Sequence, residues 1–208
     1  MVTPQANTDT TYWLSKQLNI IFSPYEDRLI IKAERGEHGT VNLLLTRRMV
    51  MIVLHQLLTP LAEISGLTKT PAQYWQDVLQ MSHQQAMQAK SDADKASAES
   101  AALEPEEQES KEPVPASAPR LYLATELTVQ VDDRQLILAF KGLPMPKAMT
   151  EPSAHEPVFA TPLQPEHVHQ LIQLLITKAQ EAQWHLPLDL PWLQNPTPES
   201  TSLGGSVH

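Results

Sequence analysis

The sequence predicts an α+β protein: duplicated β-β-β-α units that form a mostly antiparallel sheet packed by two main helices, with a disordered acidic linker between the units. Three observations support this prediction. Short apolar runs bounded by Gly, Pro and Asp are typical of strands. Apolar residues spaced at i, i+3 and i+4 are typical of amphipathic helices. The same succession of runs occurs on both sides of a segment that is poor in large apolar side chains.

The first unit is predicted from three apolar runs followed by a helical pattern. The expected strands are residues 18–22, 28–33 and 41–45. The helix is expected from Arg47 to about residue 64, because its apolar positions recur at helical spacing and Thr46 is a suitable N-cap.

The second unit repeats this plan, with expected strands at residues 127–131, 134–140 and 158–163. Its helix is expected from Pro165 to about residue 183, since proline is favoured in the first turn of a helix. Residues 27–36 align with residues 133–142, and an Asp, an Arg, an Ala, a basic residue and a Gly recur in that order. A single unit has a marginal core, so we expect the two halves to share one.

The remaining segments complete the predicted organisation. Residues 1–12 are expected to be a flexible N-terminus, and 13–89 the first half with an extra helix from about Thr70 to about Met87. Residues 90–119 are the expected linker, whose eight acidic and three basic residues give it a charge of −5. Residues 120–194 form the second half with a Pro-rich apolar tail, and 195–208 a disordered C-terminus.

Composition narrows the classes of function. The net charge of −9, from 15 basic and 24 acidic residues, argues against a nucleic-acid partner, because such binding neutralises phosphates with Lys and Arg. Cysteine is absent, which fits a cytoplasmic protein and excludes disulfides and thiolate sites. The longest apolar stretch is too short to cross a membrane, and the first residues do not resemble a signal peptide.

The sequence gives no catalytic, cofactor-binding or metal-binding residues. His167 and His169 are two apart, so on a helix they point in directions about 200° apart and cannot share one metal ion. No Gly-rich phosphate loop or nucleophile elbow is found.

Two features instead suggest contacts with a partner. Arg47 and Arg48 occupy the first turn of a predicted helix, where the macrodipole favours anions. They could contact an acidic partner, or reach carboxylates on neighbouring strands. The C-terminal region contains an unusually apolar stretch that includes Trp184, Leu190 and Trp192, and such side chains carry binding energy at interfaces.

The function predicted from these features is a non-enzymatic protein–protein interaction protein, such as an adaptor, an assembly factor or a subunit of a complex, with a protein partner or a homodimer. An alternative is a small-ligand-binding protein or an enzyme with a site between the two halves, built from dispersed residues such as Arg28, Arg47, His55 and Arg134. A regulator that touches nucleic acid through Arg47 and Arg48 is a third hypothesis.

Overall fold

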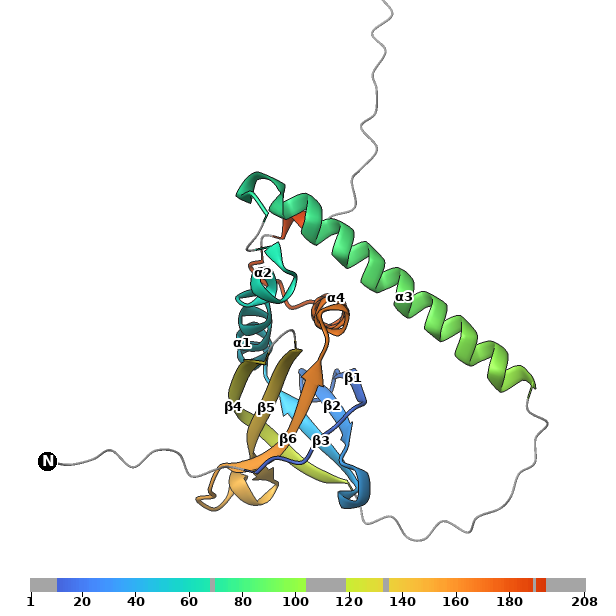
Figure 1. Cartoon of the computed structure of the whole chain (residues 1–208). Coiled ribbons are helices and arrows are strands. Elements are labelled where there is room, and N and C mark those ends of the chain that lie inside the picture. Colours follow the sequence, from blue (N-terminus) through green and yellow to red (C-terminus); the bar gives the residue numbers. More distant parts are fainter. Residues whose placement is uncertain (1–10, 68–69, 104–118, 133–134, 189, 194–208) are drawn as a thin grey trace, which may run out of the picture.

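The computed structural model describes residues 11–67, 70–103, 119–132, 135–188 and 190–193. Six strands form one mixed sheet in the order β1-β2-β3-β4-β5-β6, and helices pack against it (Figure 1). The strands are β1 (Leu18–Ser23), β2 (Arg28–Glu34), β3 (Thr40–Leu45), β4 (Arg120–Asp132), β5 (Gln135–Met145) and β6 (Glu156–Leu163). The predicted α+β class is confirmed.

The pairing between β3 and β4 joins the first half of the chain to the second. It is parallel, with Leu43 opposite Tyr122, whereas the other four pairings are antiparallel. The sheet is therefore mostly antiparallel, as predicted. The inward side chains of both halves contribute to one core, because Leu43 and Tyr122 are both buried in it.

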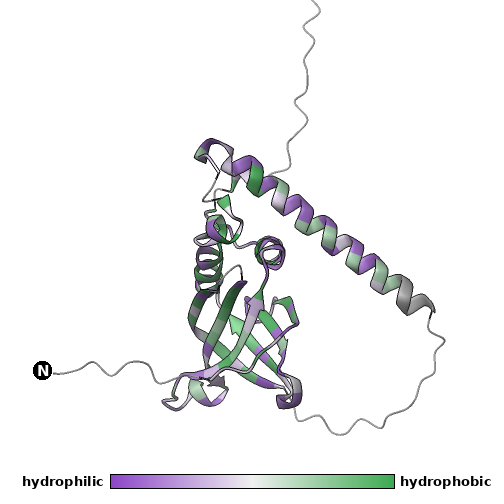
Figure 2. Ribbon diagram, viewed as in Figure 1, coloured by the Kyte–Doolittle hydropathy of each residue, from purple (hydrophilic) through white to green (hydrophobic). Residues whose placement is uncertain are grey.

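Alternation along each strand produces that core. In β2, Leu29, Ile31 and Ala33 are buried while the residues between them are more exposed, as expected for a strand with one covered face. Helices α1 (Arg47–Leu58) and α4 (Pro165–Glu181) supply the other side of the core. Figure 2 shows green apolar segments interspersed with purple hydrophilic ones along the strands.

The N-terminal segment connects the two edges of the sheet. The Ser15 backbone N–H donates to the Ala160 carbonyl oxygen at 2.8 Å, and the Ala160 N–H donates to the Trp13 carbonyl at 2.8 Å. Leu14 thereby forms a parallel bridge with Ala160 in β6. Three residues after Ser15 the chain enters β1 at Leu18. This short stretch therefore pairs with part of the β6 edge and leads directly to the opposite edge of the sheet.

Two strands are longer than predicted. β4 begins at Arg120 rather than at residue 127, and β5 continues to Met145 rather than ending at residue 140. The Gly and Pro residues after residue 140 predicted a loop. Gly142 instead allows a close approach of β4, since a Cβ atom there would lie 2.8 Å from the Leu123 carbonyl oxygen; this is the use of glycine inside a strand.

The predicted first helix is interrupted. α1 ends at Leu58, and a separate short helix α2 covers Leu61–Ile64. Pro60 lies between them and cannot donate the backbone hydrogen bond that a continuous helix needs. The predicted helix after residue 165 is confirmed as α4.

The start of the predicted linker is wrong. After the 3₁₀ helix η3 (Ala72–Tyr74), helix α3 runs over Trp75–Leu103, so residues 90–103 are helical rather than disordered. Low hydrophobicity predicted disorder, but this stretch is rich in alanine, which has the highest helix propensity. The rest of the predicted linker, residues 104–118, lies outside the described residues, as do residues 1–10 and 194–208 of the predicted termini.

Burial does not follow the residue-level alignment predicted for the two halves. The alignment matches Leu29 with Gln135, yet Leu29 is fully buried whereas Gln135 is half-buried and Leu136, the next residue, is fully buried. A shift of one residue exchanges the two faces of a strand. In the sheet, Leu29 pairs with Leu45 and Leu136 pairs with Leu163.

The starts of α1 and α4 allow a matched test of N-capping. The Thr46 hydroxyl accepts a hydrogen bond from the Met49 backbone N–H at 3.2 Å, whereas Gln164, in the same position before α4, makes no side-chain cap. We expect Thr46→Ala to lower the free energy of unfolding by about 1 kcal/mol and Gln164→Ala to leave it nearly unchanged, both measured by urea denaturation. Equal losses in the two variants would contradict this account.

Candidate functional site

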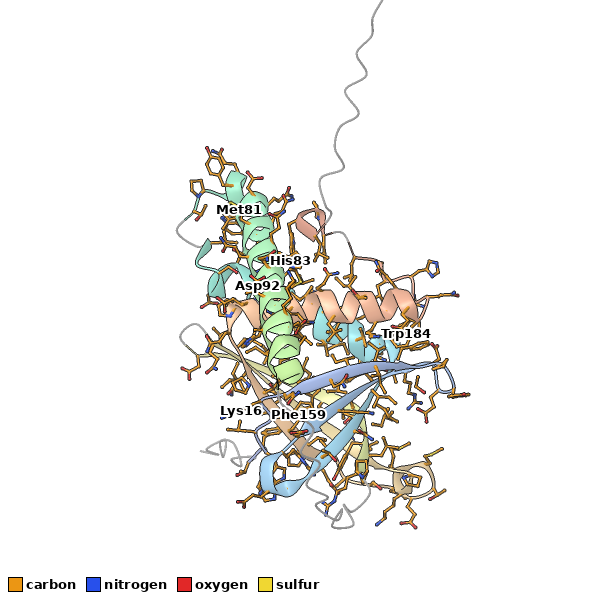
Figure 3. The ribbon with its side chains drawn as sticks, turned by 90° about the vertical axis from the view of Figure 1, so that its right-hand side faces the viewer. Lys16, Met81, His83, Asp92, Phe159 and Trp184 are labelled. Carbon is orange, nitrogen blue, oxygen red and sulfur yellow. The ribbon has the colours of Figure 1, made fainter. Side chains whose placement is uncertain are left out.

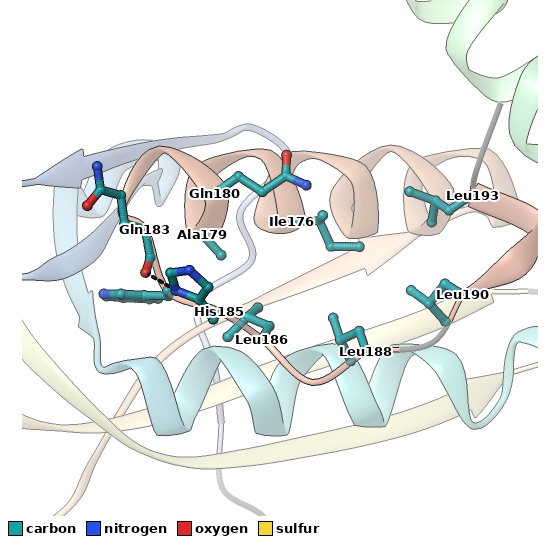
Figure 4. Close-up of a pocket in the computed structure, with 10 residues that line it drawn as sticks. Ile176, Ala179, Gln180, Gln183, His185, Leu186, Leu188, Leu190 and Leu193 are labelled. Carbon is teal, nitrogen blue, oxygen red and sulfur yellow. Dashed lines mark hydrogen bonds between the residues drawn. The ribbon is translucent and has the colours of Figure 1, made fainter. Parts of the chain in front are cut away.

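The candidate site begins where α4 ends. Gln183 has φ of 55°, and the Trp184 backbone N–H donates to the Ala179 carbonyl oxygen at 2.8 Å. This 6→1 bond with a left-handed residue before it is the Schellman arrangement, which terminates a helix and turns the chain. Residues 186–193 then return alongside α4 (Figure 4). We call residues 186–193, of which Asp189 lies outside the described residues, the strap.

A groove of about 750 Å³ lies between α4 and the strap. Figure 4 shows Leu186, Leu188 and Leu190 directed from the strap towards α4, with Ile176 directed towards them. We call this the strap groove; its lining residues are Ile176, Ala179, Gln180, Gln183, Trp184, His185, Leu186, Leu188, Leu190 and Leu193. The lining is thus mainly aliphatic, with two amide side chains and one imidazole as its polar groups.

Trp184 fixes one end of the strap groove to the first half of the chain. Its indole N–H donates to the Asp27 carboxylate at 2.6 Å, and its ring meets the Phe22 ring edge-on with centroids 6.3 Å apart. Asp27 lies in the turn between β1 and β2 with φ of 50°, a conformation that Asp tolerates better than most residues. The groove is therefore built at the junction of the two halves.

Arg47 contacts the chain at His185, the residue that precedes the strap. Its Nη2 donates to the His185 carbonyl oxygen at 2.8 Å, and the bond joins α1 to the end of the groove. A cation in the first turn of α1 was unexpected from the macrodipole. The partner is a carbonyl oxygen rather than a carboxylate, so the expectation that Arg47 reaches a carboxylate on a neighbouring strand is wrong.

The structure brings most of the predicted partner-binding residues to one region. Trp184 and Leu190 line the strap groove, and Arg47 is bonded to His185. Trp184 and Trp192 are, however, 5% and 7% exposed, so they are packed within the chain rather than presented on the surface. Arg48 is exposed and is not part of the groove lining.

A second cluster adjoins the strap groove and was missed by the sequence analysis. His83 of α3 and His169 of α4 are 8% and 1% exposed, and both rings contact the Trp192 ring, with centroids 5.5 and 5.6 Å away. Trp192 lies in the 3₁₀ helix η5 (Pro191–Leu193) within the strap. His169 is one of the buried residues of α4, next to Val168. Its place beside the apolar positions of that helix was the feature of the sequence that could have indicated its burial.

Burial governs the pKa values in this histidine cluster. Desolvation lowers the pKa of His169 from 6.5 to about 4, aided by repulsion from His83 and opposed by Glu166. Desolvation also lowers the pKa of His83, opposed by a hydrogen bond with Gln173. Both imidazoles are therefore neutral at pH 7.

The dispersed residues of the alternative hypothesis do not form one site. Across the described part of the chain, Arg28, Arg47 and His55 share no hydrogen bond or ion pair, and Arg134 lies outside it. His169 is buried and His167 exposed, as expected for helix positions two apart. Among the residues with described positions, no group of three or more His, Asp or Glu side chains could hold a metal ion. Searching the same residues finds no helix that could span a membrane.

Comparison with known proteins gives no match. No protein-family model matches the chain, no curated protein matches it, and no solved structure matches it. The site must therefore be interpreted from its own geometry.

The bond between Trp184 and Asp27 provides a test of how the groove is held. We expect Asp27→Ala to lower the free energy of unfolding by about 2 kcal/mol, because it leaves a buried N–H unpaired. Asp27→Asn, which keeps an acceptor and tolerates positive φ, should stay close to wild type in the same urea titration. Asp27→Ala also places alanine at a positive φ, which strains the backbone. Asp27→Gly separates this strain from the loss of the acceptor, since glycine removes the acceptor and adopts positive φ without strain. A loss in Asp27→Asn as large as in Asp27→Ala would contradict the assignment.

Proposed function

We propose that this protein is a non-enzymatic protein-interaction protein that receives an apolar helix of a partner in the strap groove. The observation that carries the proposal is the groove itself, an open channel lined by leucine and isoleucine side chains between α4 and the strap. Amphipathic helices bind to grooves of this kind through apolar side chains spaced one turn apart.

The side chains that line the strap groove are better suited to binding a partner than to catalysis. Leu186, Leu188 and Leu190 offer apolar contacts, while Gln180 and Gln183 offer amide donors and acceptors. His185 is the one titratable side chain in the part of the lining that the structure describes. Acid–base catalysis normally uses two neighbouring titratable groups, one of which acts as the acid and the other as the base. A lining with one such group is therefore better suited to binding than to catalysis.

The role that follows is that of an adaptor, an assembly factor or a complex subunit in the cytoplasm. The partner helix is supplied either by a different protein or by a second copy of this chain in a symmetric dimer. Sedimentation equilibrium of the full chain distinguishes the two: a monomer at all concentrations points to a different protein.

A small apolar ligand is the second candidate for the strap groove. Its volume of about 750 Å³ falls within the range of small-molecule sites, roughly 300–1,000 Å³. Native mass spectrometry of the freshly purified protein tests this candidate, which predicts a retained small molecule that organic extraction removes.

We further propose that the two halves are copies of one β-β-β-α unit. Leu45 precedes the helix cap Thr46, and Leu163, which is paired equivalently, precedes Gln164. The two cap residues have φ and ψ of −72° and 159°, and of −73° and 162°. An experimental structure in which the two units superpose poorly over their strands and helices would contradict a duplication.

Photo-crosslinking tests whether a protein enters the strap groove. We expect p-benzoylphenylalanine at Gln180, which is exposed and lines the groove, to form adducts with one protein in the native host. The same probe at Gln85, exposed on α3 and outside the groove lining, should not. Adducts with the same proteins from both positions would contradict the proposal.

A matched pair of isoleucine variants completes this experiment. Ile176 lines the strap groove, whereas Ile52 is 38% exposed on α1 and does not line it. Ile176→Gln should reduce the Gln180 adduct at least tenfold, since one buried large apolar side chain is worth about 1.5–3 kcal/mol. Ile52→Gln should leave the yield unchanged.

A further inference from the structure

His83, His169 and Trp192 form one contact between three elements. The two imidazole centroids are 5.7 Å apart, and each ring meets Trp192 close to perpendicular, at 71° and 87°. Figure 3 shows α3 passing across α4; on α3, His83 is 8% exposed and Met81 is 59% exposed. The cluster therefore lies where α3, α4 and the strap meet.

The surroundings of the cluster suit neutral imidazoles only. Both ring nitrogens of His169 and the Nδ1 atom of His83 are buried without a hydrogen-bond partner. A protonated imidazole has two N–H donors, and a buried charge without partners is strongly unfavourable. Protonation would also place two positive rings in contact.

The charged groups around the pair do not compensate for that cost. On α4, Glu166 favours the charged form of His169 but is outweighed by burial and by His83. Gln173, also on α4, hydrogen bonds to His83 and carries no charge. In the described residues of η5 the group facing the pair is the uncharged indole of Trp192, and α3 contributes His83 itself.

Release of the cluster would reach the strap groove directly. Trp192 lies between Leu190 and Leu193, both of which line the groove, and the Leu193 backbone N–H donates to the Leu190 carbonyl oxygen at 3.0 Å. The same short turn therefore contains Trp192, which contacts the histidines, and two leucines that line the groove. Movement of Trp192 out of the cluster would therefore also move Leu190 and Leu193 in the groove lining.

We propose that His83, His169 and Trp192 form a pH-operated latch, which holds α3 and the strap against α4 when the imidazoles are neutral and releases both on protonation. The consequence for partner binding rests on the function proposed above for the strap groove. The latch itself does not.

The direction of the pH dependence follows from linkage. The released histidines have the ordinary pKa near 6.5, whereas the pKa of docked His169 is about 4. Protons therefore bind preferentially to the released state, so lowering the pH favours release. Between pH 6.5 and 4 the docking equilibrium should fall by about tenfold per pH unit for each histidine that stays neutral when docked. Above pH 6.5 it should be constant.

Hydrogen–deuterium exchange of the full chain at pH 7.5 and pH 5.0, corrected for the intrinsic rate, tests the latch without any ligand. We expect protection at pH 5.0 to fall at least tenfold in peptides of residues 76–90 and 186–193. Peptides of β4 and β5 should keep their protection. Unchanged protection in the first two segments would overturn the proposal, and so would an equal loss in the sheet.

Variants assign the effect to the two histidines. His83→Phe and His169→Phe keep an aromatic ring that cannot be protonated, so the double variant should remain protected at pH 5.0. His167→Gln, an exposed position on the same helix, should behave as wild type. A double variant that loses protection like the wild type would overturn the proposal.

Proton NMR of the wild type gives a reading that does not depend on how well the variants fold. The His169 Hε1 resonance should titrate below pH 5.5, because the docked ring resists protonation, and a His169 titration near pH 6.5 would overturn the latch. These readouts need no partner. A working latch with no groove adducts would therefore refute the proposed function alone, and adducts with no pH response would refute the latch alone.

Discussion

The parallel pairing of β3 with β4 is the interaction on which the rest of this structure depends. Each half of the chain supplies three strands and one main helix, which is a small core for an independent domain. The contact of Val41–Leu44 with Arg120–Leu123 merges the two sets of strands into one six-stranded sheet. Inward residues from both sides then contribute to one apolar core, from Leu29 in β2 to Phe140 in β5. A parallel pairing needs a long crossover connection, and the chain between β3 and β4, with α1, α2 and α3, provides it.

That shared sheet also places the C-terminal region. Because α4 packs beside α1 and β1, its end lies close to the β1–β2 turn, where Asp27 accepts the indole N–H of Trp184. The strap then returns along α4 and ends at Trp192 against two histidines. One segment therefore contacts the two histidines through Trp192 and lines the strap groove through Leu190 and Leu193. Gln170 adds a further link between the helices by donating to the Ala86 carbonyl oxygen at 3.0 Å.

The strengths of these contacts differ, which matters for how the region can change. The core beneath α1 and α4 is made of fully buried aliphatic side chains such as Leu54 and Ile172, and it needs no particular protonation state. The contact of α3 with the body instead includes buried imidazoles with unpaired nitrogens. Elements that are held by fewer apolar contacts open at lower free energy than the core. We therefore expect the contact of α3 and the strap with the body to open at a lower free energy than the sheet.

The sequence by itself determined the class of fold, most strand positions and both main helices, because alternation and helical spacing are local properties of the chain. It also singled out Arg47, Trp184, Leu190 and Trp192. It did not determine the true length of α3, since polar composition is compatible with either a solvated helix or a disordered segment. The burial of Trp184 and Trp192, the carbonyl partner of Arg47 and the meeting of His83 with His169 were decided only by the tertiary structure. Each of these contacts joins residues far apart in the chain, and the parallel pairing of β3 and β4, together with the turn after α4, brings them within reach of each other.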